Sequence, residues 1–150
     1  MGTFRLFDHT ADVGLEVRGE SLADLLETAA RAVFSLVLDK GPTAAEFEEE
    51  LRVESAPPGY APAERGGGIE DALVAWLQEL LFRFETQRLV PLTFDFAEAG
   101  PRRVRARVGF GRFDPKRHRA ATEVKAVTYH ELAVREEADG AWSARFILDV

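Results

Sequence analysis

The sequence predicts an α+β fold in which two main helices pack on a mostly antiparallel sheet. Two segments carry apolar residues at helical spacing, and the second half of the chain alternates apolar and polar residues almost throughout. Asp139-Gly140 joins the last two alternating segments and is typical of a hairpin turn. With 150 residues, 46% of them hydrophobic and 30% charged, residues 1–150 fit a single domain with an ordinary buried core.

The first elements are a strand pair and a helix. Residues 4–7 and 13–18 alternate as strands do, and the polar segment 8–12 between them indicates a turn or bulge. Ser21 is a good helix cap, and the residues that follow place apolar side chains on one helical face as far as Val37. Gly41-Pro42 marks a stop shortly afterwards.

The middle of the chain contains a strand, a loop and a second helix. Residues 47–53 indicate a short charged strand, although their glutamates would also suit a helical turn. About 56–68 is too rich in proline and glycine for either structure, so a flexible loop is expected there. A second amphipathic helix is expected over 69–84.

The second half is predicted to contain four strands. Each has apolar residues at every second position, which is typical of a strand with one buried face. The segments are 90–96, 104–110, 124–134 and 142–150.

The composition excludes several classes of site. Without cysteine, the chain has no disulfide, thiolate nucleophile or Cys-ligated zinc, so a metal would be held by oxygen, helped at most by three histidines. No apolar run approaches the roughly 18 residues that a membrane-spanning helix needs. The first residues also lack the layout of a signal peptide, so a cytoplasmic protein without membrane contact is expected.

The net charge of -7 hides a basic segment. Residues 101–122 contain eight basic residues and one acidic residue, Asp114. This segment is either the solvated face of a strand and its loop, or a docking patch for phosphates or an acidic partner. The candidate docking residues are Arg112, Lys116, Arg117 and Arg119.

Segment 8–12 interrupts a region where an apolar strand should continue. Asp and Thr side chains bond nearby backbone amides, so turn formation explains the segment without any further function. The functional alternative is an oxygen-lined cation site with Asp12 and Asp8 as ligands. Two carboxylates would need further ligands.

The end of the sequence could supply those ligands. The carboxylate of Val150 would be an anion beside Asp149, and bringing both near Asp12 would cause repulsion unless a cation or basic residue lies between them. Lys125 is the basic alternative, although it also suits a solvated surface. His130 is either an ordinary core or surface histidine or a polar contact beside the site.

The motifs of nucleophilic hydrolases, paired-carboxylate glycosidases and zinc proteases are missing from the sequence, so it does not indicate an enzyme. Two further hypotheses remain. One is a cation-dependent phosphoester hydrolase that uses Asp8, His9 and Asp12. The other is a module that grips RNA through residues 101–122.

Four dispersed segments together resemble the archease family. They are residues 8–15 with the leucine-rich helix that follows, the helix 70–81, the stretch 123–130 and the ending 147–150. The similarity covers most of the chain apart from residues 46–68. Gln78 departs from the Asn of many relatives, and Arg112 stands where Glu is expected.

The resemblance implies a non-catalytic activator of the tRNA-splicing RNA ligase, which joins 2′,3′-cyclic-phosphate or 3′-phosphate ends to 5′-hydroxyl ends. Archeases promote guanylylation of the ligase from GTP and its multiple turnover. The expected partners are therefore the ligase, with GTP or RNA in the complex. The family fold is an α+β sandwich likened to the chaperone Hsp33.

The resemblance also implies site residues. The family's divalent-cation site corresponds to Asp12, Asp149 and Val150, the last through main-chain oxygen. Ca²⁺ is the expected ion, with Mg²⁺ or Mn²⁺ as alternatives. Lys125 corresponds to a residue tied to activation, and the near-site residues in the same motifs are Asp8, His9 and His130.

Overall fold

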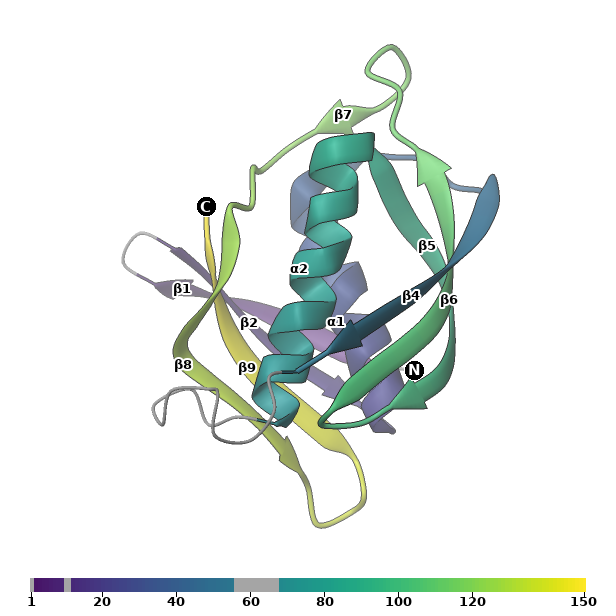
Figure 1. The fold of residues 1–150 in the computed structure, drawn as a ribbon. Helices are drawn as coiled ribbons and strands as arrows, with labels where there is room; N and C mark the ends of the chain where they lie inside the picture. Colours follow the sequence, from purple (N-terminus) through teal and green to yellow (C-terminus); the bar gives the residue numbers. More distant parts are fainter. Residues whose placement is uncertain (1, 10–11, 56–67) are drawn as a thin grey trace.

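The computed structural model describes residues 2–9, 12–55 and 68–150. Two helices lie between a four-stranded and a three-stranded antiparallel sheet (Figure 1), which confirms the predicted α+β class. The flexible loop expected at about 56–68 lies outside the described residues except for Gly68.

The four-stranded sheet joins the two ends of the chain. Its order is β1-β2-β9-β8, and all neighbouring strands are antiparallel. Leu15, Phe146 and Leu148 on its inner face are fully buried. The strands are β1 (Thr3–His9), β2 (Asp12–Gly19), β9 (Trp142–Asp149) and β8 (Ala126–Glu136).

The other strands form two further sheets, a division that the sequence did not indicate. β4 (Phe47–Glu54), β6 (Arg103–Arg112) and β5 (Leu89–Ala99) form the three-stranded sheet in the order β4-β6-β5. β3 (Leu38–Lys40) pairs with β7 (Arg119–Ala120) in a small third sheet. These last two strands are too short to produce a readable alternation.

The helices begin where the sequence predicts. α1 (Leu22–Val37) is capped by Ser21, whose Oγ accepts from the Asp24 backbone N–H at 3.1 Å. α2 (Ile69–Gln87) extends beyond the expected residue 84 and ends at Arg88, which has a left-handed φ of 56°. Across residues 2–9, 12–55 and 68–150, no helix combines the length and apolar character needed to cross a membrane.

A shared core joins the layers. Trp76 on α2 is fully buried, and its Nε1–H donates to the Leu26 carbonyl of α1 at 3.0 Å. The Trp76 ring also packs beside Phe94 and Phe96 of β5. The helices therefore bind to each other and to both larger sheets, which holds the strands that carry the site residues.

Candidate functional site

Asp12 and Asp149 lie directly opposite each other at one end of the four-stranded sheet. β2 and β9 pair with these two residues in register, and β1 places His9 opposite Asp12. Directly opposite residues of an antiparallel pair have Cβ atoms about 4.5–5.5 Å apart and share one face. Folding therefore brings two carboxylates together from opposite ends of the sequence, and we term them the acidic pair.

Lys125 adjoins the acidic pair through its main chain. Its N–H donates to the Asp149 carbonyl at 2.7 Å, just before β8 begins. Lys125 is exposed and, with Phe82 and Glu85 of α2, lines a hollow. The main chain of Lys125 is thus fixed beside Asp149, while the residue borders a surface shared with α2.

The main chain beyond Asp149 is anchored by the next residue. Val150 is half-buried and packs against the hydrophobic core. Because Val150 follows Asp149 directly, its main-chain oxygen belongs to the same end of the sheet as the acidic pair.

The near-site residues are placed less uniformly. Asp8 and His9 occupy the last two positions of β1, where the structure describes their main chain alone. His130 is in a bulge of β8, where residues 129–132 lie opposite Phe146 alone. Its Nε2 is 3.4 Å from Oε2 of Glu131. His130 is therefore out of register with the acidic pair.

Sequence reasoning missed the neighbouring row of the outer sheet face. Phe7 lies opposite Gly14, and a Cβ at Gly14 would collide with the Phe7 ring. The Arg145 guanidinium lies 3.9 Å from the centre of that ring. A glycine inside a predicted strand was the available signal, since it often marks close approach by another group.

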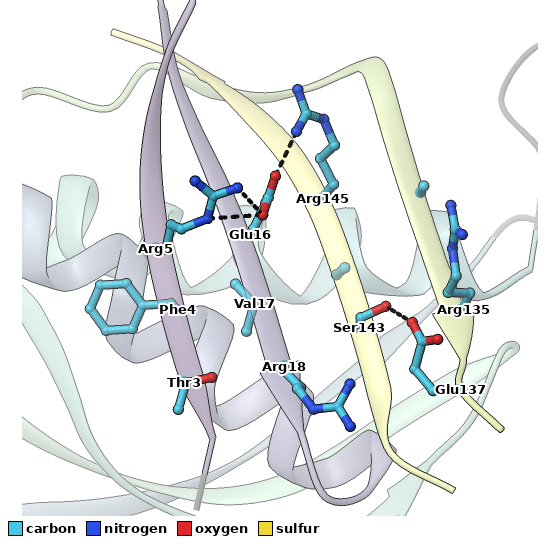
Figure 2. A pocket seen from close by; sticks show the side chains of 12 residues that line it. Thr3, Phe4, Arg5, Glu16, Val17, Arg18, Arg135, Glu137, Ser143 and Arg145 are labelled. Atoms are coloured by element: carbon cyan, nitrogen blue, oxygen red, sulfur yellow. Dashed lines mark hydrogen bonds and ion pairs between the residues drawn. The ribbon is translucent and has the colours of Figure 1, made fainter. Parts of the chain in front are cut away.

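The next row of the same face is an opposite-charge cluster. Figure 2 shows Glu16 between Arg5 and Arg145, and both ion-pair distances are 2.7 Å. The hydrogen bond from Arg5, with the charges of both arginines, holds the pKa of Glu16 below its ordinary value of 4.5, although burial acts in the opposite direction. Glu16 therefore stays ionised at neutral pH and bridges β1 to β9.

The acidic pair has the donor chemistry of a hard-cation site, because Ca²⁺ and Mg²⁺ prefer carboxylate and carbonyl oxygen. Its donor number is low. Among the side chains that the structure describes, no group of three or more His, Cys, Asp or Glu could hold an ion. Ca²⁺ takes roughly six to eight oxygen ligands. Main-chain oxygen, water or a partner's groups would therefore have to complete the shell.

The basic segment 101–122 divides into two parts. Along β6, three arginines form ion pairs with glutamates of β4, one directly opposite and two on the diagonal, at distances of 3.3 to 4.0 Å. We term these pairs the ion-pair ladder: Arg103–Glu54, Arg105–Glu50 and Arg107–Glu48. The glutamates of the ladder offset the positive charge of β6. β6 itself therefore gives little support to the hypothesis that residues 101–122 grip RNA.

The predicted docking residues also divide. Arg112 lies 3.8 Å from Glu46, and Arg119 lies 2.9 Å from Asp39. Lys116 and Arg117 are exposed and make no ion pair within the described part of the chain. Within segment 101–122, positive charge without an ion pair to another described residue therefore lies at Lys116 and Arg117 in the loop after β6, and at Arg102 before β6.

Comparison with known proteins gives a consistent set of relatives. The model of the Archease protein family (MTH1598/TM1083) matches residues 4–150. Protein archease of Methanopyrus kandleri is 36% identical over 146 residues, covering 95% of this chain and 96% of the relative. Protein archease of Sulfolobus acidocaldarius is 31% identical over 151 residues, covering all of both chains. The solution structure of Methanobacterium thermoautotrophicum protein 1598 is 29% identical and covers 98% of both chains, with a TM-score of 0.69.

Proposed function

The chain belongs to the archease family, and from that premise we propose that it is a non-catalytic activator of the tRNA-splicing RNA ligase. The ligase joins cyclic-phosphate or 3′-phosphate RNA ends to 5′-hydroxyl ends. This protein promotes guanylylation of the ligase from GTP and thereby allows repeated turnover. The observation that supports the proposal is the β2–β9 register, which sets Asp12 opposite Asp149.

In this proposal the acidic pair and a main-chain oxygen of Val150 hold a divalent cation. Two carboxylates in register repel each other, so a cation between them turns an unfavourable contact into a favourable one. Ca²⁺ suits an incomplete and irregular oxygen shell better than Mg²⁺, which demands near-octahedral geometry. When bound, the cation supplies positive charge that neutralises phosphate groups.

Lys125 has the role of a second positive group at the same edge. The hydrogen bond from its N–H to the Asp149 carbonyl ties its position to the acidic pair. The residue is exposed, so a phosphate or an acidic side chain of the ligase can reach its ammonium group. This arrangement assists the reaction by positioning and charge, without a covalent step on this protein.

Multiple-turnover ligation with limiting ligase, GTP and divalent cation tests the proposal. Asp12→Asn and Asp149→Asn should each reduce turnover about tenfold or more, because each removes a charged ligand. Asp95→Asn is the matched control, since Asp95 is exposed on β5 of the other sheet. Wild-type turnover with both site variants would reject the proposed site.

A parallel assay separates activation from hydrolysis. The protein alone, with divalent cation, is incubated with cyclic-phosphate RNA and with nucleotides. We expect no released product, whereas the hydrolase hypothesis requires one. Calorimetric titration of Ca²⁺, Mg²⁺ and Mn²⁺ should show binding to the wild type that Asp149→Asn weakens by about tenfold or more.

A further inference from the structure

A second candidate site lies at the turn between β6 and β7. A hollow of about 600 Å³ forms where β3, the segment 41–46, the end of β6 and the following turn meet. Its described lining contains a single acidic residue, Glu46. We term it the basic hollow, because its other titratable lining residues are Lys40, Arg112, Lys116, Arg117 and His118.

The turn that bears two of these cations has a defined backbone. The Asp114 carbonyl accepts from the N–H groups of Arg117 and His118 at 2.9 and 2.7 Å. The Asp114 carboxylate accepts from the Lys116 N–H at 2.9 Å, and Nδ1 of His118 accepts from the Asp114 N–H at the same distance. The nearby carboxylate thus stabilises the turn and does not pair with the Lys116 or Arg117 side chain.

Glu46 is also engaged. One of its oxygens accepts from the Arg112 N–H at 2.7 Å, and the other lies 3.8 Å from Nε of the same residue. Four cationic side chains and one carboxylate leave the lining with a formal charge of +3, in a chain whose net charge is -7. Such local excess of one sign in a concave site concentrates oppositely charged ligands.

The ladder arginines provide an internal contrast. Each of them has a glutamate of β4 within 4.0 Å, either directly opposite or on the diagonal. Lys40, Lys116 and Arg117 make no ion pair within residues 2–9, 12–55 and 68–150. Cations that lack an internal partner and converge from separate segments are suited to an external anion.

We propose that the basic hollow binds a compact polyphosphate, such as inorganic tripolyphosphate or the triphosphate of a nucleotide. Its volume is within the roughly 300–1,000 Å³ range of small-molecule sites. Phe, Tyr and Trp are absent from its described lining, and the Arg112 guanidinium already packs 5.0 Å from the centre of the Phe47 ring, so the hollow offers a base no large aromatic platform. The hollow is therefore expected to recognise phosphate charge, with little dependence on the base.

This site is independent of the proposed ligase activation. The lining of the basic hollow includes neither member of the acidic pair and does not include Lys125. Binding is therefore measured without divalent cation and without ligase, so that failure of either proposal leaves the other intact.

Calorimetry with tripolyphosphate, GTP, ATP and a short single-stranded RNA tests the inference at about 50 mM and about 200 mM salt. The first three ligands should bind within about threefold of one another, more weakly at the higher salt. The double variant Lys116→Gln/Arg117→Gln should lose about tenfold or more of the tripolyphosphate affinity. The double variant Arg52→Gln/Arg107→Gln is the matched control, because it removes the same charge from exposed positions on the three-stranded sheet and should change affinity less than about twofold.

Three results would overturn the inference: no tripolyphosphate binding at the lower salt, equal losses in both double variants, or tighter binding of RNA or of GTP than of tripolyphosphate. Equal losses would indicate diffuse electrostatic attraction to the protein surface. Tighter binding of RNA would indicate an extended binding surface, and tighter binding of GTP would indicate recognition of the base. Thermal unfolding checks that each variant folds. Lys40→Gln, from a different lining segment, repeats the test if the turn variant does not fold.

Discussion

The acidic pair and the ion-pair ladder are both charged rows on antiparallel strands, but their arrangement is opposite. In the ladder, Glu54 of β4 faces Arg103 of β6. In the acidic pair, one aspartate faces another, Asp12 opposite Asp149. Each opposite-charge pair stabilises a sheet by at most about 1 kcal/mol, and like charges directly opposite destabilise it.

The difference shows what determines the strand register. Burying a large apolar side chain stabilises a fold by about 1.5–3 kcal/mol, which exceeds the cost of one like-charge row. Leu15 and Phe146 lie opposite each other beneath the outer face and are fully buried. The core therefore holds Asp12 against Asp149. In the ladder, only Glu54 and Arg103 lie directly opposite each other, and the other two pairs are diagonal.

Breaking the core beneath the acidic pair should have the largest effect. Leu15→Ala should lower the free energy of unfolding by about 3 kcal/mol, because it leaves a cavity in the core. Urea unfolding measures the change. Leu6→Ala is the control, since Leu6 is 50% exposed on β1 and should cost less than about 1 kcal/mol. Equal costs would show that the Leu15 contacts do not hold the register.

Removing one charge from each row should give changes of opposite sign. Without divalent cation, Asp149→Asn should raise the free energy of unfolding by about 0.5 kcal/mol, because it relieves repulsion. Glu54→Gln should lower it by a similar amount, about 0.5 kcal/mol, because it removes a partner of Arg103. Urea unfolding of both variants measures these changes. Destabilisation by Asp149→Asn in metal-free buffer would contradict the interpretation of the acidic pair as a repulsive row.

Added Ca²⁺ should make the wild type more stable than Asp149→Asn, which reverses the order of stability expected in metal-free buffer. The ion binds the folded wild type, so the wild type gains stability by linkage, whereas Asp149→Asn gains little. Glu54→Gln should respond as the wild type does, because its ladder position is in the other sheet. Thermal unfolding at increasing Ca²⁺ measures the shifts. Equal shifts in all three proteins would place the ion elsewhere.

Acid titration of Glu16 should give the smallest effect. Its pKa is lowered in the folded state, so its stabilising contribution is present above its ordinary value of 4.5 and is lost as pH falls through the lowered pKa. Glu16→Gln should therefore make the acid-side fall in melting temperature shallower. The check is thermal unfolding between about pH 7 and about pH 3. An unchanged slope would show that the cluster with Arg5 and Arg145 does not contribute.

Local patterns predicted most of the fold. Ser21 and the apolar spacing that follows it located α1, and alternation located the long strands, because both signals lie within a few adjacent residues. Alternation assigns a residue to a face without naming its neighbour on the next strand. The division of the strands among three sheets, and the bulge at residues 129–132, therefore appeared only in the structure.

The candidate site could be predicted only in part, because a sequence pattern does not identify the neighbours of a residue on other strands. The register sets Asp12 opposite Asp149, as expected, but their role as ligands and the identity of any bound ion stay predictions. The net charge of residues 101–122 does not include the glutamates of β4, which are distant in sequence but lie on the strand paired with β6. Only the structure separates the matched arginines of β6 from the unmatched cations of the loop.

The bulge at residues 129–132 makes the two borders of the four-stranded sheet unequal. β8 forms one border, and its regular ladder is interrupted between Thr128 and Ala133. β1 forms the other border, pairs without a break from Thr3 to His9, and exposes Phe4 and Leu6. An interrupted border is a poor template for an incoming strand, and a straight one is a good template. The β1 border is consequently the better template in this sheet for pairing with a further strand.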